Sequence, residues 1–257
     1  YKDEALYKYA LEFDNIDLRK EGIEIPKEEL KKAYDSLEDS LKESINIAYE
    51  RVYKFHEYQR EKSFMIEEEG MILGQRIMPI ESAGLYVPGG KAAYPSSVIM
   101  NAVPAKVAGV PNIYMVCPRP TKEVLAAAYV CGIDRVFRVG GAQSIAALAY
   151  GTQTIPPVKK IVGPGNIYVA TAKRLVYGVV GIDMIAGPSE VLIIADKSAD
   201  PSFIAMDMLA QAEHDELASA ILITNSENLA NEVASELDRF LNELERKDIA
   251  SKSISNY

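Results

Sequence analysis

The stretch NIYMVCPRPTKEVLAAAYVCG, residues 112–132, joins a short apolar segment to an Ala-rich segment that ends at glycine. The same order of segments follows twice more, in RVFRVGGAQSIAALAYG (135–151) and in KKIVGPGNIYVATAKRLVYG (159–178). The short segments are apolar on both faces, as in buried strands, and the longer ones have the apolar stripe of a helix. This alternation predicts an α/β fold in which a parallel sheet has helices on both faces.

A second run of alternating segments begins near residue 187. It contains VLIIAD (191–196), a helical segment, SAILIT (219–224) and an amphipathic helix over about residues 226–246. Two strands are few for a parallel sheet that is covered on both faces. We therefore expect this second unit to be incomplete, so that it continues beyond Tyr257 or is completed by another chain.

The segment that precedes both units has the pattern of helices. Apolar residues recur at spacings of three and four from Pro26 to about Lys62, which predicts one long helix. The expected organisation is an N-terminal helical segment (1–70), a first Rossmann-like α/β unit (71–186) and the start of a second Rossmann-like unit (187–257). Neither unit carries the usual GxGxxG fingerprint, so a dinucleotide site must be built differently.

Composition and charge exclude several classes of protein. The 28 Lys and Arg residues against 37 Asp and Glu give a formal charge of −9, which disfavours nucleic acids and anionic membranes as partners. No run of about 18 apolar residues is present, and the charged first residues, YKDEALYKYALEF, differ from a signal peptide. Cys117 and Cys131 form no CxxC pair and suit packing positions in a reducing compartment. We expect a cytoplasmic protein.

Three predicted strands of the first unit end in small turns that open directly onto a helix. These turns are VCPRPT (116–121), VGGAQS (139–144) and VGPGNI (162–167). Ligands of open α/β sheets bind at the carboxyl ends of the strands, where helix N-termini favour phosphate groups. Glycine at such turns is equally suited to close packing of a helix on a strand, so the turns alone leave both interpretations open.

The chain contains only two histidines, His56 and His214. His214 follows Gln211 by three residues in LAQAEHDEL (209–217), a spacing that on a helix places both side chains on one face. Imidazole is a common zinc ligand, but a glutamine oxygen is a poor one and a zinc site needs three or four ligands. The alternatives are a histidine that hydrogen-bonds near a helix C-terminus and a solvated helix end. His56 has no ligand-type residue on its face and suits an interfacial position.

Six motifs together identify a family resemblance. They are SAGLYVPGG (82–90), NAVPAKVAGV (101–110), RVGGAQSIAALAYGT (138–152), KIVGPGNIYVATAKR (160–174), IDMIAGPSEVLIIAD (182–196) and LAQAEHD (209–215). In this order and at about this spacing they resemble histidinol dehydrogenase, over nearly the whole chain. The resemblance implies an oxidoreductase of histidine biosynthesis that oxidises L-histidinol through L-histidinal to L-histidine. It also implies that the enzyme consumes two NAD, binds a zinc ion that positions the substrate, and is a homodimer.

The resemblance also assigns individual residues. Carried over by motif, Tyr86, Gln143 and Asn166 are the expected NAD contacts. Ser189 is expected to contact the substrate, and Gln211 and His214 are expected to be zinc ligands that also lie at the substrate.

The sequence departs from the family pattern in its catalytic groups. The family's general base is a histidine preceded by glutamate, and its other zinc ligands are an aspartate and a histidine further along the chain; no residue here matches them. We therefore assign no catalytic residue and expect this chain alone to be inactive. Two alternatives remain: a related zinc- and NAD-dependent dehydrogenase of another small polar alcohol, and a truncated, non-catalytic protein that binds nucleotide or regulates a partner.

Overall fold

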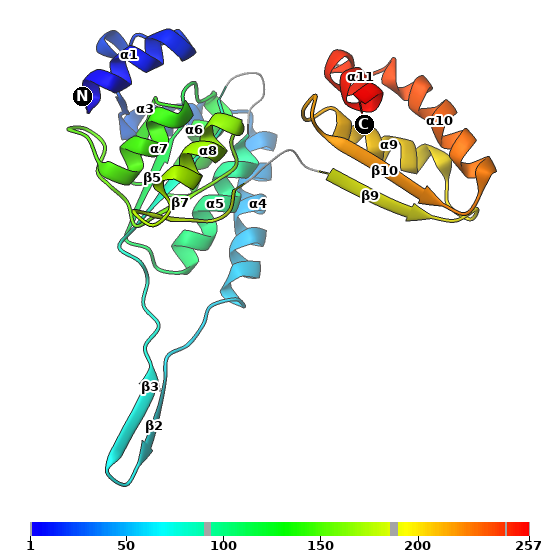
Figure 1. The fold of residues 1–257 in the computed structure, drawn as a ribbon. Coiled ribbons are helices and arrows are strands. Elements are labelled where there is room, and N and C mark those ends of the chain that lie inside the picture. Colours follow the sequence, from blue (N-terminus) through cyan, green and yellow to red (C-terminus); the bar gives the residue numbers. More distant parts are fainter. Residues whose placement is uncertain (1, 90–93, 186–189, 245, 257) are drawn as a thin grey trace. The chain divides into compact units, whose positions relative to one another are not determined.

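The computed structural model describes residues 2–89, 94–185, 190–244 and 246–256. The chain forms two compact units, Tyr1–Ile185 and Ala186–Tyr257 (Figure 1). Residues 1–70, which we expected as a separate helical segment, belong to the first unit.

The first unit is built on a sheet whose strands lie in the order β1-β6-β5-β4-β7-β8. The strands are β1 (Glu24–Ile25), β4 (Ser82–Tyr86), β5 (Asn112–Val116), β6 (Arg135–Phe137), β7 (Lys160–Val162) and β8 (Gly181–Ile182). The edge strand β1 pairs antiparallel to β6, and the other five strands are parallel. From β6 to β8 this is the strand order 3-2-1-4-5 of the Rossmann fold. The expected α/β fold with a mainly parallel sheet is confirmed.

Helices cover both faces of this sheet (Figure 1). One face carries α3 (Lys27–Asp35), α4 (Asp39–Glu57), α5 (Pro95–Val107) and α6 (Lys122–Val130), and the other carries α1 (Asp3–Asp14), α2 (Leu18–Glu21), α7 (Gly141–Tyr150) and α8 (Ile167–Val176). Neighbouring side chains of a strand point to opposite faces. In β5, Met115 therefore packs into the first core and Val116 into the second.

The long N-terminal helix that the apolar spacing predicts is in fact two helices. The break lies between α3 and α4, where the Oγ of Ser36 donates a hydrogen bond to the carbonyl of Ala33 at 2.8 Å and Glu38 is extended, with φ −65° and ψ 147°. Leu37, between them, is buried in the core. The periodic pattern did not reveal the break because both helices contribute apolar residues to the same core.

A two-stranded antiparallel hairpin extends from the first unit (Figure 1). It consists of β2 (Phe64–Glu68) and β3 (Met71–Gln75), and every residue of both strands is exposed. Apolar side chains such as Ile72, which is 69% exposed, occur on both strands. The hairpin therefore contributes nothing to the core of this unit.

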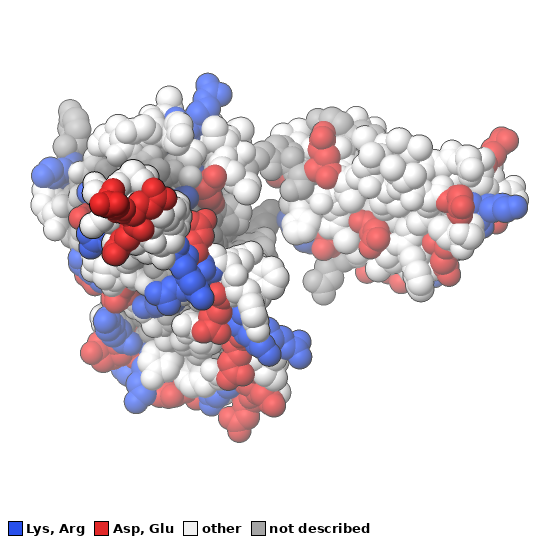
Figure 2. All heavy atoms as spheres, turned by 90° about the horizontal axis from the view of Figure 1, so that it is seen from below, with Lys and Arg blue, Asp and Glu red and all other residues white. Residues whose placement is uncertain are grey.

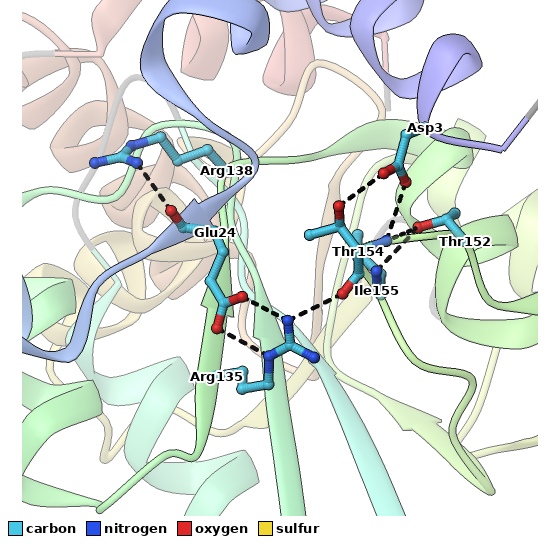
Figure 3. Close-up of polar contacts among 7 residues, drawn as sticks. All are labelled: Asp3, Glu24, Arg135, Arg138, Thr152, Thr154 and Ile155. Atoms are coloured by element: carbon cyan, nitrogen blue, oxygen red, sulfur yellow. Dashed lines mark hydrogen bonds and ion pairs between the residues drawn. The ribbon is translucent and has the colours of Figure 1, made fainter.

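Polar side chains attach the N-terminal segment to the amino-terminal edge of the sheet (Figure 3). The guanidinium of Arg135 donates to the carboxylate of Glu24 at 2.8 and 2.5 Å and to the carbonyl of Thr154 at 3.0 Å. The hydroxyl of Thr154 donates to the carboxylate of Asp3 at 2.7 Å. Because a bidentate arginine fixes its partner's orientation, this network holds β1 and the start of α1 at the edge opposite to the turns described below.

The second unit contains two parallel strands and three helices among its described residues. They are β9 (Glu190–Ala195), α9 (Pro201–Ala212), β10 (Ser219–Thr224), α10 (Glu227–Leu241) and α11 (Lys247–Asn256). Ile193 and Leu222 point from the strands into a core with α9 and α10. The alternate residues Ile194 and Ile223 are 76% and 52% exposed, so only one face of this small sheet is packed.

The surface carries both signs of charge. On the face drawn in Figure 2, lysines and arginines of the first unit are interspersed with aspartates and glutamates. This arrangement differs from the basic stripe of a nucleic-acid interface. In the described parts of the chain, no helix is long and apolar enough to cross a membrane.

Candidate cofactor-binding edge and partial metal site

The carboxyl ends of β4 and β7 meet at the switch point of the first sheet. From β4 the chain adds β5 and then β6 on one side, and it then crosses to place β7 and β8 on the other. The helix after β4 packs on one face and the helix after β7 on the opposite face. In open α/β sheets, ligands bind where connections leave in opposite directions.

Three turns at this edge pack closely around one proline. A Cβ atom at Gly89 would lie 2.8 Å from the Cγ of Pro118, and one at Gly140 would lie 2.6 Å from the same atom. Side chains at these two positions would displace Pro118, so the turns after β4 and β6 pack their glycine backbones against the proline ring of the turn after β5. Gly140 thus serves close packing, one of the two interpretations that the sequence left open. This packing brings the turns together at one edge of the sheet.

Tyr86 is the last residue of β4 and is 4% exposed. Its hydroxyl accepts a hydrogen bond from the amide of Gly141 at 3.4 Å. Burial raises the pKa of Tyr86 to about 12; the Gly141 hydrogen bond opposes this shift, and Cys117 and Asp14 add to it. The phenol, which is neutral at physiological pH even with its ordinary pKa, therefore stays neutral further into the alkaline range and can donate a hydrogen bond.

Gln143 lies in the first turn of α7. Its amide nitrogen Nε2 is buried and has no hydrogen-bond partner among the described residues. An unsatisfied buried amide costs about 1–3 kcal/mol, so a native structure normally supplies a partner. A bound ligand with oxygen acceptors, such as the phosphates or amide of a dinucleotide, satisfies this donor. The residues at this edge therefore fit NAD.

Asn166 begins α8 as its N-cap. Its Oδ1 accepts hydrogen bonds from the amides of Tyr168 at 3.1 Å and Val169 at 3.2 Å, and the residue is exposed. The cap uses the oxygen, while the side-chain amide also carries two N–H donors. Tyr86, Gln143 and Asn166 thus all lie at the carboxyl edge of the same sheet, and Gln143 and Asn166 lie in two of the three turns that the sequence singled out.

Asp14, at the end of α1, was not identified from the sequence. Its Oδ2 is buried without a hydrogen-bond partner among the described residues, and burial raises its pKa, against the opposing charge of Arg119. Arg119, from the turn after β5, donates to the carbonyl of Asp14 at 2.6 Å. No local pattern marks Asp14, because the residues that surround it are distant in sequence.

In the second unit, the structure places His214 just beyond the helix on which we expected it. The helix α9 ends at Ala212, and the amide of His214 donates to the carbonyl of Gln211 at 3.2 Å in the following turn. His214 is exposed. His214 therefore lies in the turn past the end of the helix on which we expected it, and the common face of the two side chains stays a prediction. His56 is half-buried, and its Nδ1 lies 2.6 Å from the Oε1 of Gln59.

The described residues do not complete a zinc site. They contain no group of three or more His, Cys, Asp or Glu side chains that could hold a metal ion. Gln211 and His214, the two ligands expected from the sequence, would by themselves leave a zinc ion mostly hydrated. Ser189, the expected substrate contact, lies outside the described residues.

A parallel sheet with Rossmann strand order and a ligand edge at its switch point defines the class of open α/β proteins. The family model for histidinol dehydrogenase matches residues 1–257, and the chain belongs to the histidinol dehydrogenase family. The histidinol dehydrogenase of Aquifex aeolicus is 60% identical over 99% of this chain, and that of Sulfurimonas denitrificans is 51% identical over 98% of it. The chain spans about 60% of the length of these relatives.

A solved structure of the same family agrees with this assignment. The crystal structure of histidinol dehydrogenase from Elizabethkingia anophelis matches with a TM-score of 0.90 and 39% identity, over 98% of this chain and 59% of the other. An acetylating aldehyde dehydrogenase from Geobacillus thermoglucosidasius matches with a TM-score of 0.50 and 14% identity, over 92% of this chain and 58% of the other, which shows a likeness of fold alone.

Proposed function

We propose that this chain is the NAD-binding part of an enzyme that oxidises L-histidinol through L-histidinal to L-histidine, consuming two NAD. The observation that carries the proposal is the buried side-chain amide nitrogen of Gln143, which finds no hydrogen-bond partner in the described part of the chain, at the switch-point edge of a sheet in the histidinol dehydrogenase family. When bound, NAD supplies the hydride acceptor.

The proposal gives each residue of this edge a role. Gln143 donates a hydrogen bond to the cofactor through its Nε2, and Asn166 donates through its side-chain amide while its oxygen caps α8. Tyr86 donates through its hydroxyl, which carries its proton at physiological pH. The N-termini of α7 and α8 add the positive ends of their helix dipoles, which favour phosphate.

The proposal assigns the substrate and the metal to the second unit. Ser189 and His214 contact histidinol, and Gln211 and His214 provide part of a zinc site whose other ligands, together with the general base, lie elsewhere in the full-length protein. The chain alone is therefore inactive. We further propose that the full-length protein is a cytoplasmic homodimer.

The metal assignment is tested in the full-length protein with His214→Ala. This variant should lose at least about tenfold in zinc affinity and should lose histidinol oxidation. The melting temperature of the zinc-free protein should be unchanged, because His214 is exposed. Zinc is measured by mass spectrometry and NAD affinity by calorimetry. The control is His56→Ala, which changes the only other histidine in the sequence and should retain zinc and activity.

Zinc content and turnover that survive His214→Ala contradict the metal assignment. A full-length, zinc-loaded protein that binds NAD but oxidises another small polar alcohol in place of histidinol contradicts the substrate. A protein that binds no NAD contradicts the proposed function as a whole.

A further inference from the structure

Gly163 is the residue at which β7 leaves the sheet beside β4. The paired residues of the two strands end at Leu85 and Val162, so Gly163 and Tyr86 are the first residues past the ladder. A Cβ atom at Gly163 would lie 2.1 Å from the carbonyl oxygen of Tyr86, and the φ of Gly163 is +115°. Only glycine fits this close approach, so the turn that leads to Asn166 starts from a conformation that other residues rarely adopt.

Lys173 binds the carbonyl side of this glycine. It belongs to α8, is 1% exposed, and donates from Nζ to the carbonyl of Gly163 at 3.0 Å. It also forms an ion pair with Asp183, which follows β8. A buried ammonium is costly unless it is paired and hydrogen-bonded, and both conditions are met here. An apolar side chain of similar volume could fill such a place in a core, so packing alone does not explain a lysine.

Asp183 binds the amide side of the same glycine. Its Oδ2 accepts from the amide of Gly163 at 2.8 Å, and its Oδ1 accepts from Lys173 and from the amide of Met184 at 2.7 Å. Both backbone groups of Gly163 are thus bonded to side chains that are bonded to each other. This closed ring of interactions joins three parts of the chain, namely the end of β7, α8 and the segment after β8, and so fixes the turn that begins at Gly163.

We propose that Lys173 and Asp183 are positioning residues for NAD: by clamping Gly163 they fix the turn that presents Asn166 and the N-terminus of α8 to the cofactor. The inference rests on the proposed function, because it concerns the same edge of the sheet. Neither residue contacts the cofactor in this proposal. Both act through the backbone of Gly163, so the clamp exists before NAD binds.

The test compares NAD affinity in full-length wild type, Lys173→Met and Lys173→Arg. Lys173→Met removes the donor to Gly163 and should raise the Kd for NAD about tenfold, since a displaced turn misorients its ligand groups. The KM for histidinol should change less than about twofold, because a lost clamp affects the cofactor and not the substrate. Lys173→Arg keeps a charged donor and should restore part of the affinity. A folded Lys173→Met protein with unchanged Kd overturns the proposal.

Two further measurements separate the clamp from general stability. Glu24→Gln removes the ion pair with Arg135 at the opposite edge of the sheet, and it should lower the melting temperature without changing the Kd for NAD. In wild-type protein without NAD, hydrogen exchange should find the Gly163 amide protected, and an unprotected amide overturns the proposal even if Lys173→Met fails to fold. Wild-type protein that binds no NAD overturns the proposed function. Wild-type protein that binds NAD, together with a Lys173→Met variant that binds it equally well, overturns only the positioning role of Lys173.

Discussion

The hydroxyl of Tyr86 accepts a hydrogen bond from the amide of Gly141, so the end of β4 is joined to the start of α7. The bond is noteworthy because β5 lies between β4 and β6, the strand that precedes α7. It therefore connects two turns that are not neighbours in the sheet. Both turns carry residues that we propose as NAD contacts.

Tyr86→Phe tests this connection. The ring should stay buried, so the fold is kept, and the lost hydrogen bond should lower the free energy of unfolding by about 0.5–1.5 kcal/mol. If the hydroxyl also donates to NAD, the Kd should rise by a further factor of about 5, equivalent to about 1 kcal/mol. Calorimetric titration and urea unfolding measure the two effects. An unchanged Kd removes Tyr86 from the cofactor contacts.

Gln143→Ala should separate binding from stability more sharply. Because the Nε2 of Gln143 has no partner among the described residues, its removal should leave the free energy of unfolding unchanged or higher. The Kd for NAD should rise about tenfold, since one hydrogen bond to a ligand is worth about 1–3 kcal/mol when its partner is left unpaired.

Gln153→Ala is the matched control for Gln143→Ala. The Oε1 of Gln153 accepts from the amide of Asp3 at 3.0 Å, at the opposite edge of the sheet. This variant should lose about 1 kcal/mol of stability and leave the Kd for NAD unchanged. If Gln143→Ala and Gln153→Ala change the free energy of unfolding by similar amounts and also change the Kd for NAD by similar factors, Gln143 has a structural role only.

Much of the first unit could be predicted from local sequence. The segments from β5 to α8 alternate in the predicted order, and the turns containing Gln143 and Asn166 lie at the carboxyl ends of strands as expected. These features are local, because strand burial, helix periodicity and turn composition each depend on a few neighbouring residues.

The features that the sequence did not reveal depend on distant residues. Lys173 meets Gly163 ten residues away through a turn, and the closely packed Gly89 and Gly140 meet only around Pro118. His214 was expected on a helix because spacing alone does not mark where α9 ends. Such partners are set by the tertiary fold and have no periodic signature.

Gly163→Ala should destabilise the first unit strongly. The added Cβ would meet the Tyr86 carbonyl oxygen at 2.1 Å, and the positive φ is unfavourable for alanine. Strain of this kind costs about 1–3 kcal/mol in the backbone alone, and displacement of Tyr86 adds to it. Urea unfolding measures the loss. Gly178→Ala is the control, since Gly178 also has a positive φ, +98°, but nothing lies within 4 Å of its added Cβ. Equal losses in both variants would show that the contact with Tyr86 is unimportant.

The two buried thiols should make the first unit sensitive to alkali. Burial raises the pKa of both Cys117 and Cys131 from 9.0 to about 12. Because the folded pKa is the higher one, this contribution to stability is complete below pH 9 and is lost as the pH rises towards 12. The free energy of unfolding should fall in that window by up to about 1.4 kcal/mol per pH unit for each thiol. Urea unfolding at several pH values measures the slope, which should be shallower in a Cys117→Ala, Cys131→Ala double variant. Rapid alkylation of both thiols in the folded protein at pH 8 would contradict their burial.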